Sequence, residues 1–211
     1  MKKLISFIFS IVVAAVAMAQ TPEEIVSRME AEMDKHDNSE GLAITIDLKI
    51  PIVGSMSTRS YTLGDKIRME ATNKGNKIIT WIDGDTEWDY NAEKNEVEIK
   101  KKEIKDSEKS KEDDDDTKLF KGVTDGYDVT LDKETDTEWH FLCKRSRKNK
   151  DKDAPKKMEL VIKKGTYMPV SLSTRLSGVS MTLRDIEFGV TDEQVTFNPE
   201  EFPTATIIDK R

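Results

Sequence analysis

The chain has 211 residues and a formal net charge of −7, from 34 basic and 41 acidic side chains. A negative balance opposes general binding to nucleic acid or to an anionic membrane surface, so we expect neither as a partner. The sequence contains one cysteine, Cys143, which excludes a disulfide within the chain. The fold must therefore be held by packing.

The first 19 residues have the features of a secretory signal peptide. Lys2 and Lys3 precede an apolar run over residues 4–16, and residues 17–19 (Ala-Met-Ala) supply the small side chains of a cleavage site. The run is too short to span a bilayer of about 30 Å. We expect cleavage after Ala19, and Gln20, which follows, cannot accept an N-terminal lipid. We therefore expect a periplasmic protein in which residues 20–211 form a single domain.

The segment that follows is predicted to form an amphipathic helix. Thr21 and Glu24 have the spacing of a capping box, and Pro22 occupies the first helical position. Three apolar residues recur at four-residue spacing: Ile25, Met29 and Met33. We expect a helix from Thr21 that ends near residues 36–38, with this apolar face packed on a sheet.

Most of the remaining chain shows the two-residue alternation of β-strands. Residues 42–50 alternate without a break, and the same pattern returns further along the chain. The later segments lie near residues 67–71, 97–99, 127–131, 139–143, 158–162, 170–172 and 179–183. Glycine-containing turns separate neighbouring segments, as the hairpins of an antiparallel meander require. We expect a mainly β protein of about ten or eleven strands.

Clean alternation leaves one apolar face that something must cover. A second sheet, closure into a small barrel, or one wide curved sheet around the helix would each do so. The last arrangement leaves apolar surface available for a ligand. The nine methionines weakly favour it, because Met adapts to varied apolar ligands, although Met also fills ordinary cores.

Two charge-rich stretches, residues 100–121 and 144–157, interrupt the strands. Both are predicted to be solvated loops, because neither can bury enough apolar area to fold alone. Four consecutive aspartates, residues 113–116, lack the spaced ligands and glycine of a calcium loop. We expect no metal site.

Catalytic motifs are absent from the sequence. His36 and His140 show no sign of acting as a pair, and both are expected to be structural or exposed. Cys143 shares a strand face with Trp139 and Phe141, which predicts a buried apolar side chain rather than a nucleophile. We expect neither an enzyme nor a bound cofactor.

Two segments resemble a known family. Residues 82–91 (Ile-Asp-Gly-Asp-Thr-Glu-Trp-Asp-Tyr-Asn) are similar to an aspartate-glycine and aromatic hairpin of the LolA-like periplasmic carriers of outer-membrane lipoproteins. Residues 195–199 and 207–209 resemble the closing strand and tail of that family. The order of the elements agrees along the whole chain after the signal peptide.

The resemblance implies an unclosed antiparallel half-barrel of about eleven strands, with a helix and a lid segment on the concave face. Such proteins shelter lipoprotein acyl chains and carry them, as monomers, from an inner-membrane release complex to an outer-membrane acceptor. At ~0.8 kcal/mol per CH₂, exposing a sixteen-carbon chain to water costs roughly 13 kcal/mol, so transfer through water needs a container. The alternative is an envelope sensor or interaction module that binds a protein partner.

The apolar face and lid region predict a lipid-binding surface. Its residues are Met29, Met33, Ile46, Leu48, Met69, Trp81, Trp88, Leu160, Ile162, Met181 and Leu183. Residues 78–83 are apolar at both parities, so we expect Trp81 and Trp88 to lie under the lid as well as in the sheet.

The lid itself differs from that of the family. Gly64 occupies the position of the arginine that latches the lid in the family, and Arg59 and Arg68 are near but not matched. We therefore expect the latch to be absent or rebuilt. Four residues are expected to supply apolar contacts in the lid: Ile104, Leu119, Phe120 and Val123.

Overall fold

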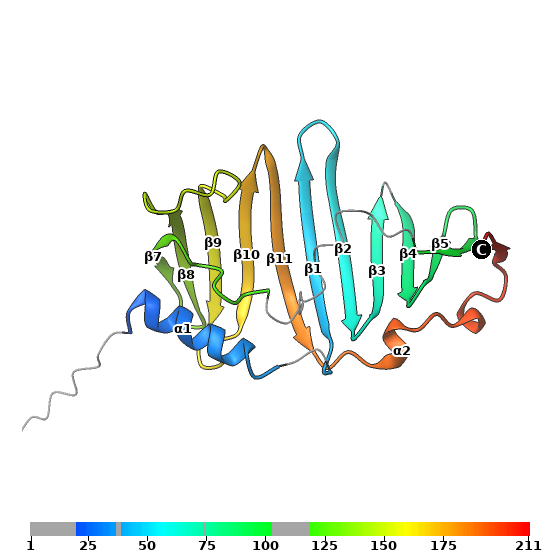
Figure 1. Ribbon diagram of the computed structural model, residues 1–211, viewed down its shortest axis with the longest axis horizontal. Coiled ribbons are helices and arrows are strands. Elements are labelled where there is room, and N and C mark those ends of the chain that lie inside the picture. Colours follow the sequence, from blue (N-terminus) through cyan, green and yellow to red (C-terminus); the bar gives the residue numbers. More distant parts are fainter. Residues whose placement is uncertain (1–19, 37–38, 74, 103–118) are drawn as a thin grey trace, which may run out of the picture.

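The computed structural model describes residues 20–36, 39–73, 75–102 and 119–211. The expected signal peptide and most of the charged stretch 100–121, including Ile104, lie outside these residues. Within them, twelve strands form one sheet that does not close on itself, and a helix, α1 (Pro22–Met33), lies across one end of it (Figure 1). The predicted fold class, a mainly β unclosed sheet with an N-terminal helix, is confirmed.

The strands follow the predicted meander. Their bounds are β1 Leu42–Ile50, β2 Gly54–Leu63, β3 Lys66–Asn73, β4 Asn76–Asp83, β5 Thr86–Asn91, β6 Glu96–Lys101, β7 Tyr127–Glu134, β8 Glu138–Arg145, β9 Lys157–Lys163, β10 Pro169–Leu176, β11 Val179–Phe188 and β12 Thr206–Asp209. The order in the sheet is β12-β6-β5-β4-β3-β2-β1-β11-β10-β9-β8-β7. All neighbours are antiparallel except β12, which pairs parallel with β6. The pairing of β1 with β11 joins the two halves of the meander.

The first helix forms by the predicted capping box. Thr21 Oγ1 accepts a hydrogen bond from the Glu24 amide at 3.2 Å, and Glu24 Oε2 accepts one from the Thr21 amide at 3.0 Å. Helical geometry ends at Met33, and a turn leads on to His36, slightly earlier than the sequence predicted.

A first core forms where α1 packs on one face of strands β7 to β11 and β1; we call this face the α1 face. Its buried members are Ile25, Val26, Met29, Met33, Ile44, Phe120, Phe141, Cys143, Met158, Leu160, Ile162, Leu172 and Leu183. The helix contributes the three predicted apolar residues, so its packing on the sheet is confirmed. No second sheet occurs among the described residues, which excludes a sandwich there.

A second core lies on the opposite face, over strands β2 to β6. Directly paired residues of antiparallel strands share a face. Through this register Ala43, Tyr61, Arg68 and Trp81 lie on one face, and Ile44 lies on the other.

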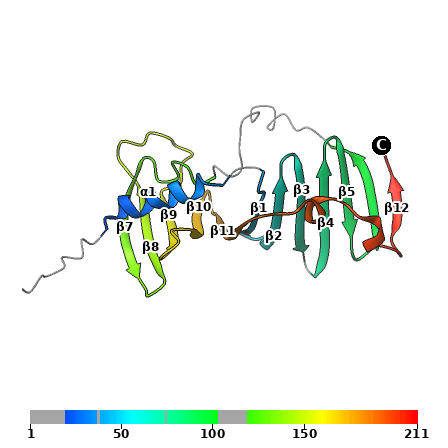
Figure 2. The ribbon, with the colours of Figure 1, turned by 90° about the horizontal axis from the view of Figure 1, so that it is seen from below.

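The segment after β11 covers this opposite face. It contains two short helices, α2 (Asp192–Val195) and η2 (Pro199–Glu201), and crosses the sheet to reach β12 (Figure 2). Val190 and Val195 pack with Ala43 beneath it. We call residues 190–205 the C-terminal cover.

No helix in the described ranges is both long enough and apolar enough to cross a membrane.

Gly41 precedes β1 in a left-handed conformation with φ of +67°. A Cβ placed there would lie 2.7 Å from the Thr62 carbonyl oxygen and 2.8 Å from Val190 Cβ, so a side chain collides with the C-terminal cover. Gly64, in the β2–β3 turn, has a similar φ of +59° but open space around its Cβ position.

The pair allows a matched test. Both Gly41→Ala and Gly64→Ala place a side chain on a residue with positive φ, which destabilises the folded state. Gly41→Ala also overpacks the second core. We expect Gly41→Ala to lower the free energy of unfolding by about 1–3 kcal/mol more than Gly64→Ala, measured by urea denaturation. Equal losses would contradict the tight packing of the C-terminal cover against β1 and β2.

Candidate ligand-binding face

Five of the eleven residues predicted to bind lipid are buried in the first core. They are Met29 and Met33 on α1, Leu160 and Ile162 on β9, and Leu183 on β11. In this arrangement these side chains contact other residues of the protein and not a ligand, because α1 and Phe120 cover the apolar face.

Four more of the predicted residues continue the same face away from α1. Leu48 pairs directly with Met181, and Ile46 pairs with Leu183. Met69 pairs with Ser60, the partner of Ile44. Ile46, Leu48, Met69 and Met181 are all half-buried. The α1 face is therefore continuous from the helix-covered core to the middle of the sheet.

Trp81 and Trp88 do not belong to this face, which corrects their predicted position. They pair with each other across β4 and β5, and Trp81 pairs with Arg68, on the face opposite α1. Trp81 is 1% exposed and Trp88 is half-buried. Phe197 of the C-terminal cover lies 5.3 Å from the Trp81 ring and 5.8 Å from the Trp88 ring, measured between centroids.

The reason for the misplacement is visible in the sequence. Residues 78–83 are apolar at both parities, so the pattern required two covers but could not say which one lay over the indoles. The aromatic residues that supply the second cover, Phe197 and Phe202, lie far along the chain in a segment without periodicity.

The two arginines near the latch position also point to the second face. Arg68 Nη1 donates a hydrogen bond to the Gln194 carbonyl at 3.2 Å, and its guanidinium lies 5.4 Å from the Trp81 ring centroid. Arg59 forms an ion pair with Glu187 at 2.8 Å. Arg68 thus holds the C-terminal cover on the sheet. Within the described residues, an arginine near the latch position therefore fixes this segment and not the predicted lid.

Lys66 strengthens the same attachment. Its Nζ lies 2.7 Å from Asp192 Oδ1 and 3.7 Å from Asp83 Oδ2. The hydrogen bond with Asp192 raises the pKa of Lys66, and the same contact lowers the pKa of Asp192. Sequence reasoning missed this pair because its members are separated by more than a hundred residues.

Helix α1 makes fewer polar contacts than the C-terminal cover, and these contacts lie at the sides of the helix. The Arg28 guanidinium and the Gln20 amide each hydrogen-bond to the Tyr167 hydroxyl at 3.0 Å. Glu30 Oε1 accepts a hydrogen bond from the Gly122 amide at 3.1 Å. This last contact connects α1 to the end of the predicted lid segment.

At this end of the predicted lid segment, two of the three described residues make the predicted apolar contacts. Phe120 is buried in the first core, and Val123 packs against it, whereas Leu119 is exposed. A hollow of about 460 Å³ lies between α1 and the start of β7, lined among others by Val26, Glu30 and Tyr127. It opens to solvent beside the covered face.

The side chains that could carry chemistry are engaged in structure. The His36 ring stacks on Phe188 with 3.8 Å between centroids, and His140 lies 3.2 Å from Glu138. Cys143 is fully buried, and burial raises the pKa of its thiol to about 11. Among the described residues no group of three or more His, Cys, Asp and Glu side chains could hold a metal ion.

Comparison with known proteins finds similar structures but no similar sequence. No protein-family model matches the chain, and no curated protein matches it by sequence. Among solved structures, LprF from Mycobacterium bovis matches 84% of this chain and 96% of its own, at 10% identity and a TM-score of 0.53. The chain shares the fold of LprF.

Two further solved structures are similar at lower scores. The lipoprotein LppX from Mycobacterium tuberculosis covers 81% of this chain and 98% of its own, at 11% identity and a TM-score of 0.47. A LolA superfamily protein from Nitrosomonas europaea covers 85% of this chain and 99% of its own, at 13% identity and a TM-score of 0.30.

Glu30 offers a test of how α1 is held. Burial raises the pKa of its carboxyl, and the hydrogen bond from Gly122 opposes that shift. The folded state therefore binds this proton more tightly than the unfolded state, so the contribution of Glu30 to stability falls as pH rises from 4.5 through the raised pKa.

We expect Glu30→Gln, which keeps an acceptor oxygen for the Gly122 amide without burying charge, to raise Tm at pH 7. Near pH 4 the carboxyl is largely protonated in both states, and the two proteins should unfold at closely similar temperatures. Thermal unfolding by circular dichroism at both pH values measures this. A lower Tm for Glu30→Gln at pH 7 would contradict the account.

Proposed function

We propose that the protein is a carrier of the cell envelope that holds the acyl chains of a lipoprotein, or of a related lipid, against its α1 face. The observation that carries the proposal is the continuity of this face. It runs from the core beneath α1 to the half-buried Ile46, Leu48, Met69 and Met181. The fold shared with LprF and the resemblance of the 82–91 hairpin to LolA-like carriers support it.

Binding on this face requires α1 to move. The helix covers the sheet mainly through Ile25, Met29 and Met33, and these contacts are apolar and without direction. An acyl chain can replace them with contacts of the same kind. At ~0.8 kcal/mol per CH₂, a sixteen-carbon chain gains roughly 13 kcal/mol by leaving water, which can offset the displacement of the helix.

Methionine suits both states of such a face. Met29, Met33, Met158 and Met181 all belong to or pack against the first core. Their unbranched thioether side chains can repack around a helix or around a lipid chain without a fixed shape. A face built for one permanent partner has no need of this adaptability.

The attachment of the helix is consistent with displacement. The polar contacts of the helix are the hydrogen bonds from Arg28 to Tyr167 and from the Gly122 amide to Glu30. The described residues contain no ion pair between α1 and the sheet. In contrast, an ion pair and stacked rings fix the C-terminal cover. We therefore assign cargo to the α1 face and a permanent structural role to the second core.

The proposed setting is the periplasm, with the acylated cargo passed from an inner-membrane release complex to an outer-membrane acceptor. The protein needs no catalytic group for this, since shelter and release are both binding steps.

Met181→Glu tests the cargo face directly. Met181 lies half-buried on β11 at the boundary between the covered and the open parts of the face, so a carboxylate there meets the acyl chain. We expect folding with a loss of at most about 1–3 kcal/mol, and a loss of acyl binding of at least about tenfold. Fluorescent fatty-acid or lipoprotein binding, alongside thermal unfolding, measures both.

Thr182→Glu is the matched control, because Thr182 is the next residue and points to the opposite face. It should bind like the parent. If Met181→Glu unfolds the protein outright, Met181 is ordinary core. If both variants fold and bind like the parent, the carrier assignment of this face is wrong.

A further inference from the structure

One end of the sheet carries an exposed apolar tip. The β1–β2 hairpin turns through Pro51, Ile52 and Val53, and Ile52 is fully exposed and Val53 76% exposed. Ile52 also has a φ of +71°, a conformation that disfavours a β-branched residue. Packing among the described residues accounts for neither side chain. Leu176, at the end of β10, adds a third exposed apolar residue at this end.

The meander gathers basic segments at the same end. Since consecutive strands alternate in direction, the β1–β2, β8–β9 and β10–β11 turns all lie at one end of the sheet (Figure 1). Residues 144–157, which comprise the β8–β9 loop and the strand residues that flank it, include eight lysines or arginines and two aspartates. Arg175, from β10, lines one hollow with Lys156 and another with Lys49 and Ile52.

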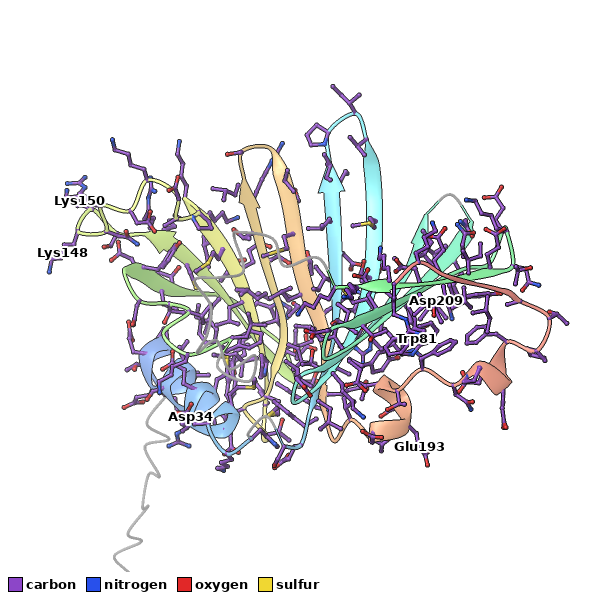
Figure 3. The ribbon with its side chains drawn as sticks, turned by 45° about the vertical axis from the view of Figure 1, so that its right-hand side comes forward. Asp34, Trp81, Lys148, Lys150, Glu193 and Asp209 are labelled. Carbon is purple, nitrogen blue, oxygen red and sulfur yellow. The ribbon has the colours of Figure 1, made fainter. Side chains whose placement is uncertain are left out.

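The β10–β11 turn lies against the apolar tip, and Arg175 beside that turn lines a hollow with Lys156 of the basic segment, so the tip and the basic segment are neighbours on one end of the sheet. A Cβ placed on Gly178 of the β10–β11 turn would lie 3.6 Å from Pro51 Cγ. Internal hydrogen bonds shape the basic loop: Arg145 Nη1 donates to the Asp151 and Ala154 carbonyls at 2.6 and 2.9 Å. Lys148 and Lys150 extend away from the body of the protein (Figure 3).

The other end of the sheet has the opposite charge. Turns 83–86 and 134–138 carry five carboxylates: Asp83, Asp85, Glu134, Asp136 and Glu138. Lys66 and Lys164 neutralise part of this charge. The described sheet is therefore polarised along its strands, although the net charge of the chain is negative.

We propose that the basic end docks on an anionic lipid bilayer, with Ile52 and Val53 entering the interface and the lysines of the 144–157 loop contacting the phosphate headgroups. An apolar tip surrounded by cations is the combination that a peripheral membrane contact needs. The acidic end is repelled by the same surface, which orients the strands across it. The net charge of −7, which argued against membrane binding, is thus overridden locally.

This inference deepens the proposed carrier function but rests on different residues. The docking residues lie outside the cargo face, so the variants below should bind a fluorescent fatty acid like the parent. Loss of vesicle binding with intact acyl binding is therefore separate from failure of the carrier assignment.

Vesicle co-sedimentation of the purified protein tests the docking. The probes are phosphatidylcholine vesicles with and without phosphatidylglycerol. We expect binding to the anionic vesicles alone. The variants Ile52→Ser/Val53→Ser and Lys148→Glu/Lys152→Glu should each weaken it about tenfold or more, at ~1 kcal/mol per basic residue near the surface for the second variant.

Matched controls lie at other parts of the sheet. Ile207→Ser removes another exposed isoleucine, and Lys101→Glu/Lys133→Glu makes the same charge change at the acidic end. Both controls should bind the anionic vesicles more strongly than the test variants. No binding by the parent, or equal losses in test and control variants, would overturn the proposal. A parent dimer that Ile52→Ser/Val53→Ser converts to a monomer, without vesicle binding, would assign the tip to a second copy instead.

Discussion

Burial of apolar side chains on opposite faces of one sheet is the constraint on which the rest of the structure depends. Strands β7 to β11 are apolar on the α1 face, whereas β4 to β6 place Trp81, Trp88 and Val97 on the other face. At the start of β1, Ala43 and Ile44 are both buried although they point in opposite directions. Such a sheet needs two covers, and the ends of the chain supply them.

The two covers are attached by different physics. The C-terminal cover is fixed by directional contacts, namely the Lys66–Asp192 ion pair, the Arg68 hydrogen bond and the stacked rings of Phe197 and Trp88. Helix α1 is held mainly by apolar packing, which another apolar surface can replace at little cost. One cover is therefore suited to stay in place and the other to be displaced, which is the asymmetry that the proposed carrier role requires.

Much of the first core could be predicted from the sequence, because its signals are local. The capping box at Thr21, the spacing of Ile25, Met29 and Met33, and the alternation of residues 42–50 each identify an element and its buried side. Cys143 was placed correctly from the aromatic residues on its own strand face. These inferences needed no knowledge of distant contacts.

The second core could not be predicted in the same way. Residues 78–83 showed that β4 is apolar on both faces, but the partner of the second face is a segment more than a hundred residues away. That segment has short helices and no periodicity, so nothing local indicates that Phe197 packs on Trp81. The sequence therefore assigned both indoles to the lid, and the contacts of Arg68 and Lys66 were missed with them.

Hydrogen exchange with and without bound acyl cargo tests the central claim most directly. The account predicts that saturating the protein with a fluorescent fatty acid or an acylated peptide increases the exchange rate of the α1 amides, from Ile25 to Met33, because the cargo displaces the helix. Amides in and under the C-terminal cover, near Val195 and Trp81, should exchange at unchanged rates. Unchanged or slower exchange in α1 at saturating cargo would contradict the account.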